Sequence, residues 1–357
     1  MAGKRFIVFR LILSLFSMVF VLLVVEVVLR LAPSAPGPDP LGDRSSYFYV
    51  PDEACRHLWT RGATNILRLA AIGDSFTAGA GVQVDDRYAE RLERLLNTRA
   101  GMTPAEVHVF AKNGTSTFQQ VGLLDDALKE KPRIILLGIC LNDMEDWARP
   151  EVLKQWRHRI LATPPRMVRH SRALSWMYLK LKWAECHRME RRYFRRLYDP
   201  SYSGFHRFQE AIEDMNTKCA EARVAFIPVI FPLLSDTDSF REGHYAFEYA
   251  HAAIRGRCKE LNIPCLDLLQ AFRAATPDRL SVMPKFDPHP NEIGHRMAAE
   301  AILQFLIDGG FVAPEYKPPV RPSAMQQLRI WQRSIRAEDT IARGATNPAE
   351  ESAEGKK

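Results

Sequence analysis

The sequence predicts an α/β protein, a three-layer α/β/α sandwich with a five-stranded parallel sheet, preceded by one transmembrane helix. Three observations carry this prediction. Short apolar runs alternate with amphipathic helical patterns through most of the chain, the order that builds parallel sheets. Residues 134–139 are apolar throughout, as in a strand buried on both faces. Residues 6–31 are long and apolar enough to cross a hydrocarbon core of about 30 Å.

The N-terminal apolar segment is interpreted as an uncleaved signal-anchor spanning residues 1–32. Lys4, Arg5 and Arg10 flank its start, so the N-terminus is expected in the cytoplasm and the rest of the chain in the periplasm or outside the cell. The segment is long for the apolar region of a cleaved signal peptide, which is the alternative interpretation. The proline-rich residues that follow open a stalk and lead-in segment over residues 33–64.

The body of the chain, residues 65–312, is expected to form one domain. Five strands are predicted from short apolar runs: 67–72, 107–110, 134–139, 224–230 and 265–268. Helices are predicted from apolar positions at helical spacing: 86–96, 118–128, 205–222, 245–261 and 291–307. Residues 313–357 form a C-terminal extension whose charged end, from about residue 336, lacks apolar periodicity and is expected to be disordered.

The positive charge of the chain is concentrated in one insertion, residues 149–200. The whole chain of 357 residues carries a net charge of +7, whereas this insertion holds 14 Lys or Arg against four Asp or Glu. Trp176 and Trp183 are among the aromatic and apolar residues that alternate with these charges, which indicates basic amphipathic helix. Such a helix could be a solvated face packed on the domain edge or could rest on a membrane surface. Nucleic acid is excluded as a partner by the predicted outward orientation.

Polar residues follow the predicted strands at four places. Gly73-Asp74-Ser75 comes after the first strand, Asn113-Gly114-Thr115 after the second and Asn142-Asp143 after the third, and Asp287-Pro288-His289 opens the last helix. Open α/β sheets bind ligands at the carboxyl ends of their strands. Each block alone could be turn chemistry, but together they supply a nucleophile, an amide donor and a carboxylate–histidine pair.

These four blocks, in this order, resemble those of the SGNH (GDSL-type) hydrolases. The similarity extends over residues 67–306 and implies a flavodoxin-like hydrolase fold and a Ser-His-Asp triad of Ser75, His289 and Asp287. It also implies an oxyanion hole made by Ser75, Gly114 and Asn142. Asp74 is interpreted as a structural residue of the turn and His295 as a packed or surface histidine.

Two departures from the family pattern affect these assignments. Three residues rather than one separate Gly138 from Asn142, which puts the backbone support of Asn142 in doubt. Only Pro288 separates Asp287 from His289, where the family usually has two residues. A Ser–His dyad supported by a backbone carbonyl is therefore an alternative to the triad.

The resemblance implies a serine esterase, and the topology suggests O-acyl, especially O-acetyl, esters of a cell-surface or cell-wall glycan as substrates. The alternatives are a lipase or lysophospholipase at the membrane surface and a non-hydrolytic glycan-binding or assembly component with the same fold. The six cysteines lack metal-ligand spacing, and no phosphate loop or dinucleotide fingerprint occurs, so neither metal nor cofactor is expected. One disulfide, Cys219–Cys258 or Cys258–Cys265, is plausible in an extracytoplasmic domain, and Cys140 is interpreted as a buried thiol. The sequence leaves the oligomeric state open.

Overall fold

The computed structural model describes residues 2–31, 66–97, 103–145, 165–234, 240–283 and 287–316. Its main sheet has five parallel strands in the order β2-β1-β3-β4-β5. The strands are β1 (Leu67–Gly73), β2 (Ala105–Ala111), β3 (Ile134–Ile139), β4 (Ala225–Ile230) and β5 (Leu266–Asp267). The chain reverses its winding direction at β1, because β2 lies on one side of β1 and β3 on the other.

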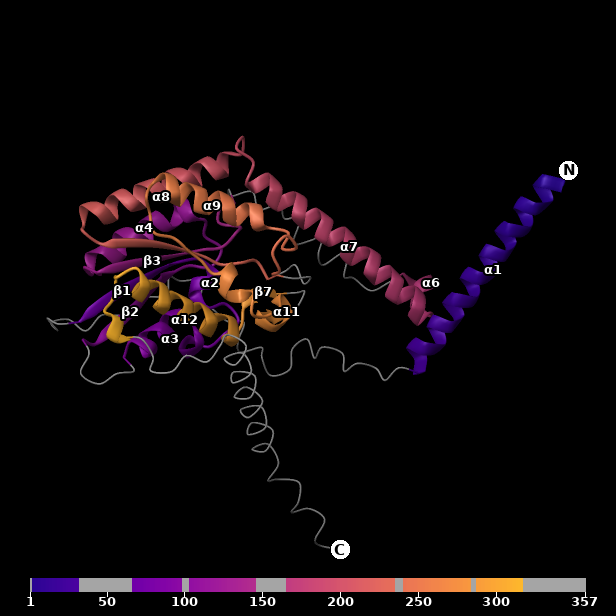
Figure 1. Cartoon of the computed structure of the whole chain (residues 1–357), viewed down its shortest axis with the longest axis horizontal. Helices are drawn as coiled ribbons and strands as arrows, with labels where there is room; N and C mark the ends of the chain where they lie inside the picture. Colours follow the sequence, from indigo (N-terminus) through magenta and orange to yellow (C-terminus); the bar gives the residue numbers. More distant parts are fainter. Residues whose placement is uncertain are drawn as a thin grey trace, which may run out of the picture. The chain divides into compact units, whose positions relative to one another are not determined.

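Helices cover both faces of this sheet, which confirms the predicted three-layer α/β/α architecture. On one face α3 packs against α12, and on the other α4 packs against α8, with α9 beside them (Figure 1). The bounds of these helices are α3 (Tyr88–Leu96), α4 (Thr117–Lys129), α8 (Ser203–Glu221), α9 (Glu248–Glu260) and α12 (Glu292–Asp308). Strand β3 is buried at every position, because both faces of the sheet are covered.

Several short elements complete this part of the chain. They are α2 (Ser75–Ala78), η2 (Val84–Asp86), α10 (Leu269–Phe272), α11 (Pro277–Leu280), β6 (Ser281–Met283), β7 (Asp287–Pro290) and η3 (Pro314–Tyr316). Strands β6 and β7 pair as a separate antiparallel ribbon. Residues 287–290, which directly precede the predicted helix 291–307, form strand β7, a strand that the sequence did not predict. Helix α12 begins only after Asn291, whose side chain caps it by accepting from the Ile293 and Gly294 N–H groups, both at 3.1 Å.

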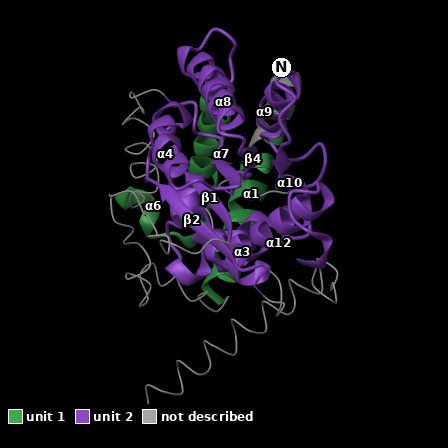
Figure 2. Ribbon diagram, turned by 90° about the vertical axis from the view of Figure 1, so that its left-hand side faces the viewer, with its two compact units in different colours: residues 1–44, 147–193 green, residues 45–146, 194–357 purple. Residues whose placement is uncertain are grey.

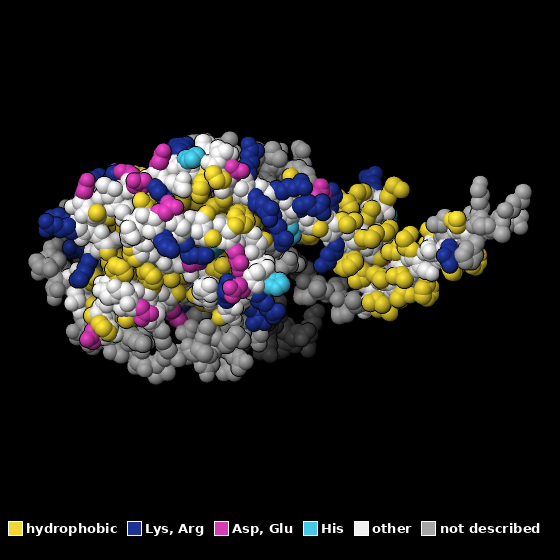
Figure 3. All heavy atoms as spheres, turned by 45° about the horizontal axis from the view of Figure 1, so that its top comes forward, with side chains coloured by type: hydrophobic (Ala, Val, Ile, Leu, Met, Phe, Trp, Pro, Cys, Tyr) yellow, Lys and Arg dark blue, Asp and Glu magenta, His cyan; other side chains and the backbone are white. Residues whose placement is uncertain are grey.

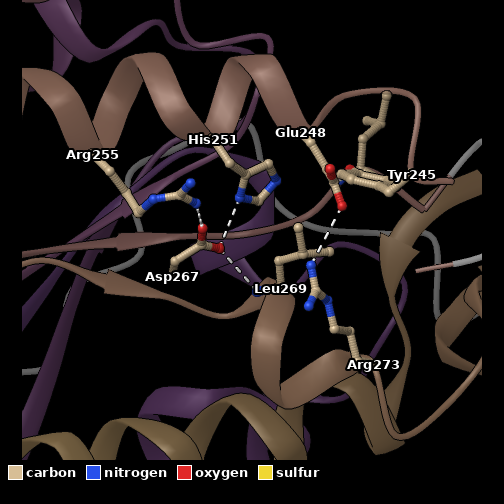
Figure 4. Close-up of polar contacts among 8 residues, drawn as sticks. Tyr245, Glu248, His251, Arg255, Asp267, Leu269 and Arg273 are labelled. Atoms are coloured by element: carbon tan, nitrogen blue, oxygen red, sulfur yellow. Dashed lines mark hydrogen bonds and ion pairs between the residues drawn. The ribbon is translucent and has the colours of Figure 1, made fainter. Parts of the chain in front are cut away.

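The two-residue edge strand β5 is held by a charged network (Figure 4). One carboxylate oxygen of Asp267 lies 2.7 Å from His251 Nδ1 and accepts from the Leu269 N–H at 3.0 Å, while Arg255 pairs with the other oxygen. Burial raises the pKa of Asp267, but the His251 hydrogen bond and charge outweigh burial, so this pKa lies below its ordinary value. The ionised carboxylate therefore joins α9, β5 and α10 where few strand–strand hydrogen bonds are available.

The chain divides into two compact units (Figure 2). One comprises residues 45–146 and 194–357 and contains both sheets. The other comprises residues 1–44 and 147–193, and its helices are α1 (Ala2–Leu31), α6 (Arg166–Arg169) and most of α7 (Arg172–Leu197). Within the described ranges, α1 is the one helix long and apolar enough to span a membrane. The predicted stalk, residues 149–164 of the insertion and the tail after residue 316 lie outside the described residues.

Candidate active site

Ser75 stands at the first position of α2, directly beyond the carboxyl end of β1. Asp74 caps this helix, since its Oδ1 accepts from the Phe76 N–H at 2.9 Å. The Ser75 hydroxyl lies 3.3 Å from Asp74 Oδ2 and is only partly buried. The sharp passage from strand to helix thus presents a serine oxygen at the edge of the sheet, and Asp74 has the turn-stabilising place expected from the sequence.

The position of α2 depends on a tight contact between Thr77 and two glycines. A methyl group added to Gly73 would lie 2.2 Å from Thr77 Oγ1, and one added to Gly138 would lie 2.3 Å from the same atom. Thr77 Oγ1 also hydrogen-bonds the buried Tyr88 hydroxyl at 3.1 Å. The two glycines, on adjacent strands, therefore make room for the side chain that seats α2 and, with it, Ser75. The sequence pattern gave no indication of this role for Thr77 and Tyr88.

His289 reaches Ser75 from strand β7. Its Nε2 lies 2.9 Å from Ser75 Oγ, and its Nδ1 lies 2.5 Å from Asp287 Oδ1. The same Asp287 oxygen accepts from the His289 backbone N–H at 3.0 Å. Residues two apart on a strand project to the same side. The single-residue spacing between Asp287 and His289 therefore brings the carboxylate and the imidazole together.

Gly114 and Asn142 lie in the loops that flank the Ser75 turn, because β2 and β3 are the neighbours of β1. Gly114 adopts a left-handed conformation with φ of 71°, which favours glycine. The two loops are tied together, since the Thr117 N–H donates to the Asp143 carbonyl at 3.2 Å and Ser116 donates to the Glu145 carbonyl. Asn142 is partly exposed, and within the described residues its side-chain amide makes no hydrogen bond.

Asp143 is a buried carboxyl group beside the site. Its Oδ2 accepts from the Thr117 hydroxyl at 3.1 Å, and its Oδ1 has no partner within the described structure. Burial and then the charge of Asp74 raise the pKa of Asp143 well above its ordinary value. The same two causes raise the pKa of the buried Cys140 thiol. Burial therefore favours the neutral forms of the Asp143 carboxyl and the Cys140 thiol.

His295 does not reach Ser75. It is fully buried, and its Nδ1 accepts the Tyr88 N–H at 3.2 Å. Burial and the charges of Arg91 and Arg87 lower its pKa to about 3, so it is neutral. His295 is therefore a packed residue that supports α3, the helix carrying Tyr88.

No group of three or more His, Cys, Asp or Glu side chains that could hold a metal occurs among the residues the structure describes. The five cysteines in the described ranges, Cys219, Cys258 and Cys265 among them, form no disulfide. The plausible disulfide is thus not present in this structure.

A serine, an imidazole and a carboxylate hydrogen-bonded in series at the carboxyl edge of a parallel sheet are typical of serine hydrolases. The sequence pattern of the GDSL-like Lipase/Acylhydrolase family matches residues 71–297, which include all four polar blocks. The chain belongs to this family and is an acylhydrolase that acts on carboxylic esters. No curated protein matched the chain.

Solved structures similar to this chain include an acetyl xylan esterase, 15% identical, with a TM-score of 0.44, covering 67% of this chain and all of its own length. A catalytic mutant of an acetylxylan esterase from Geobacillus stearothermophilus is also 15% identical, with a TM-score of 0.43, covering 67% of this chain and 94% of its own. A G-D-S-L family protein from Desulfitobacterium hafniense is 16% identical, with a TM-score of 0.39, covering 67% and 99%.

Proposed function

We propose that Ser75 is the nucleophile of this esterase, His289 its general base and acid, and Asp287 the group that orients His289. The observation that carries the proposal is the unbroken series from Ser75 Oγ to His289 Nε2 at 2.9 Å and from His289 Nδ1 to Asp287 Oδ1 at 2.5 Å. The carboxylate favours the tautomer with a proton on Nδ1, which leaves Nε2 free to accept the serine proton.

In the first half-reaction, Ser75 Oγ attacks the ester carbonyl carbon while His289 Nε2 takes the hydroxyl proton. The tetrahedral intermediate collapses, the carbon–oxygen bond to the alcohol breaks, and His289 returns the proton to the leaving alcohol oxygen. Water then attacks the acyl-serine by the same route and releases the carboxylic acid and Ser75. Asp287 stabilises the imidazolium that forms in each half-reaction.

The Ser75 and Gly114 N–H groups and the Asn142 side-chain amide are proposed as the donors to the oxyanion. Gly114 and Asn142 flank the Ser75 turn on either side, and the Asn142 amide has no competing partner within the described chain. One such donor typically lowers the transition-state free energy by about 3 to 4 kcal/mol.

As substrates we propose O-acyl esters, in particular O-acetyl esters, on a cell-wall or cell-surface glycan. The support is α1, which is long and apolar enough to span a membrane. With its basic flank in the cytoplasm, the proposed orientation would bring the esterase to the side where such glycans lie. A lipase or lysophospholipase would instead favour esters with long acyl chains. A non-hydrolytic glycan-binding component would cleave neither acetyl nor long-chain esters.

The test uses the full chain in detergent with p-nitrophenyl acetate and a long-chain p-nitrophenyl ester. We expect cleavage with preference for acetate, loss of cleavage in Ser75→Ala, and covalent labelling of Ser75 by a fluorophosphonate. Ser201→Ala is the matched control, because Ser201 is an exposed serine paired with Asp199. Unchanged rates in Ser75→Ala would refute the proposed nucleophile, and a long-chain preference would favour the lipase.

The location is tested separately by a reporter fused after residue 357 and by the intact mass of the membrane-extracted chain. Reporter activity outside the cytoplasm together with a full-length mass supports the anchor. A mass lacking α1 would show a cleaved signal peptide instead.

A further inference from the structure

Glu26 interrupts the apolar helix α1, and its carboxylate binds the start of α7. Glu26 Oε2 accepts from the Ser171 hydroxyl at 2.7 Å and from the Ala173 N–H at 2.8 Å, while Oε1 pairs with Arg30 at 2.6 Å. The first N–H groups of a helix have no partner within the helix and carry partial positive charge. The carboxylate of one helix thus caps another that begins about 145 residues later in the chain.

Further contacts join the two helices at the same place. Arg172 donates to the Leu29 carbonyl at 2.8 Å, and Arg30 donates to the His170 carbonyl at 3.3 Å. The residues of this part of α1 that are half-buried rather than exposed recur at helical spacing and share one face: Leu22, Val25, Glu26 and Leu29. A carboxylate in an apolar helix is costly unless it is paired. Here two of its partners, Ser171 and Ala173, lie at the start of α7, so Glu26 is explained as an attachment point.

The face of α7 that starts at this joint continues as an exposed apolar surface. Ala173, against Glu26, is only 3% exposed, whereas Trp176 is 52% and Leu181 66% exposed one and two turns later. Met177 lies between them on the same face, and Lys180 places its ammonium group 5.8 Å from the centre of the Trp176 ring. We define Trp176, Met177, Lys180 and Leu181 as the α7 face. On the elongated part of the molecule at the right of Figure 3, where Figure 1 places α7 and α1, hydrophobic side chains predominate and a few Lys and Arg side chains lie among them.

We propose that the α7 face lies in the interface of the membrane that α1 crosses and contacts anionic phospholipid. The inference rests on the proposed anchoring of α1. Glu26 precedes the end of α1, Leu31, by five residues, about 7 to 8 Å along the axis. Amphipathic helices bury their apolar face about 5 to 10 Å into the headgroup and acyl boundary. The Glu26 cap therefore holds the start of α7 at the depth where such helices rest.

The chemistry of α7 fits this partner better than a second copy of the chain. Tryptophan is enriched at the membrane interface, and lysine and arginine there contact lipid phosphates. Along α7 eight Lys or Arg residues stand against two Glu, and Arg166 and Arg169 precede it on α6. Two copies meeting through this face would bring like charges together, whereas anionic headgroups neutralise them.

The depth is tested with the full chain in nanodiscs of phosphatidylcholine and phosphatidylglycerol whose acyl chains are brominated near the headgroup. The emission of Trp176 is the difference between the emission of the wild type and that of Trp176→Phe. Bromine quenches tryptophan on contact, so this difference should be at least about twofold smaller in brominated than in plain lipid. In the Trp176→Phe background, Leu181→Trp should restore quenched emission. Lys182→Trp should add unquenched emission, because neighbouring residues project about 100° apart. Equal quenching of both, or of neither, would overturn the proposal.

The role of Glu26 is tested by Glu26→Leu, with Glu26→Gln as the conservative variant that keeps one acceptor oxygen. Glu26→Leu should speed amide exchange at Ala173 and weaken Trp176 quenching, and Glu26→Gln should lie between it and the wild type. Replacing phosphatidylglycerol by phosphatidylcholine should also weaken quenching, and insensitivity to this change would refute the anionic contact.

The outcomes separate this inference from the proposed function. If the intact mass shows α1 retained and the reporter lies outside, absent quenching refutes the membrane contact alone. A cross-linked dimer with unquenched Trp176 would assign the α7 face to a second copy. Loss of α1 by cleavage would refute the anchor and, with it, this inference. The esterase test on Ser75 is independent of all three.

Discussion

Gly138→Ala tests whether Thr77 seats the helix that carries Ser75. The new methyl group would lie 2.3 Å from Thr77 Oγ1, whereas ordinary contacts begin near 3.4 Å, so the hydroxyl must move by about 1 Å. Overpacking of this kind costs about 1 to 3 kcal/mol of unfolding free energy. Because α2 holds both residues, we expect Ser75 to shift too, and a misplacement of about 1 Å costs about 100-fold in kcat.

The contact predicts a rescue that is specific to one glycine. Thr77→Ala removes the clashing oxygen, leaving the Tyr88 hydroxyl 3.2 Å from the Gly138→Ala methyl, a contact that a shift of a few tenths of an ångström relieves. Thr77→Ala costs about 1 to 3 kcal/mol by itself, because the buried Tyr88 hydroxyl loses its partner. The double variant should therefore be about as stable as Thr77→Ala alone, a coupling of about 1 to 3 kcal/mol.

Gly73→Ala is the matched control for this rescue. Its methyl group would still meet Thr77 Cβ at 2.8 Å and the Gly138 carbonyl at 2.9 Å after the hydroxyl is removed. We therefore expect Gly73→Ala to lower the unfolding free energy by nearly the same amount when Thr77→Ala is also present. Urea unfolding in detergent and ester hydrolysis measure both effects. Equal destabilisation by Gly138→Ala with and without the Thr77 hydroxyl would refute the reasoning.

Two further predictions concern Asp287 and His295. Asp287→Asn should lower kcat by about 10³- to 10⁴-fold, because the amide neither fixes the His289 tautomer nor balances its charge; a loss below about tenfold would instead support the Ser–His dyad. The pKa of His295 is about 3 in the folded chain and about 6.5 when unfolded, so the unfolded state binds the proton and stability falls as pH drops below about 6.5. His295→Asn keeps an acceptor for the Tyr88 N–H but does not titrate, so urea unfolding across this range should show a weaker pH dependence, and an unchanged slope would contradict this origin.

The five parallel strands could be predicted because strands buried on both faces appear in the sequence as short, continuous apolar runs. Their bounds differ from prediction by a few residues at most, as in β2, which extends to Ala105–Ala111. Strand β7 could not be predicted, since Asp287–Pro290 has polar residues and two prolines, and its pairing with β6 is not encoded in local periodicity. The cap that Glu26 provides to α7 joins segments about 145 residues apart and leaves no local signal.

The candidate site likewise combines residues that could be predicted from the sequence with residues that could not. Ser75, His289 and Asp287 could be proposed from motifs because their order along the chain follows the order of strand ends. Thr77 and Asp143 act through packing and burial, and residue type alone does not reveal either property. Thr77 is distinguished by the two glycines that face it, a relation visible only once β1 and β3 are paired.

The short spacing between Asp287 and His289 has a mechanical consequence. In many triads the acid and the base come from separate loops, so their alignment depends on how those loops are fixed to the scaffold. Here a single strand carries the proposed acid and base, and one carboxylate oxygen of Asp287 binds the backbone and the ring of His289. Asp287 and His289 therefore keep their relative position when the strand is displaced. Displacement of the β6–β7 ribbon changes the distance from His289 to Ser75 without disturbing the hydrogen bond between acid and base.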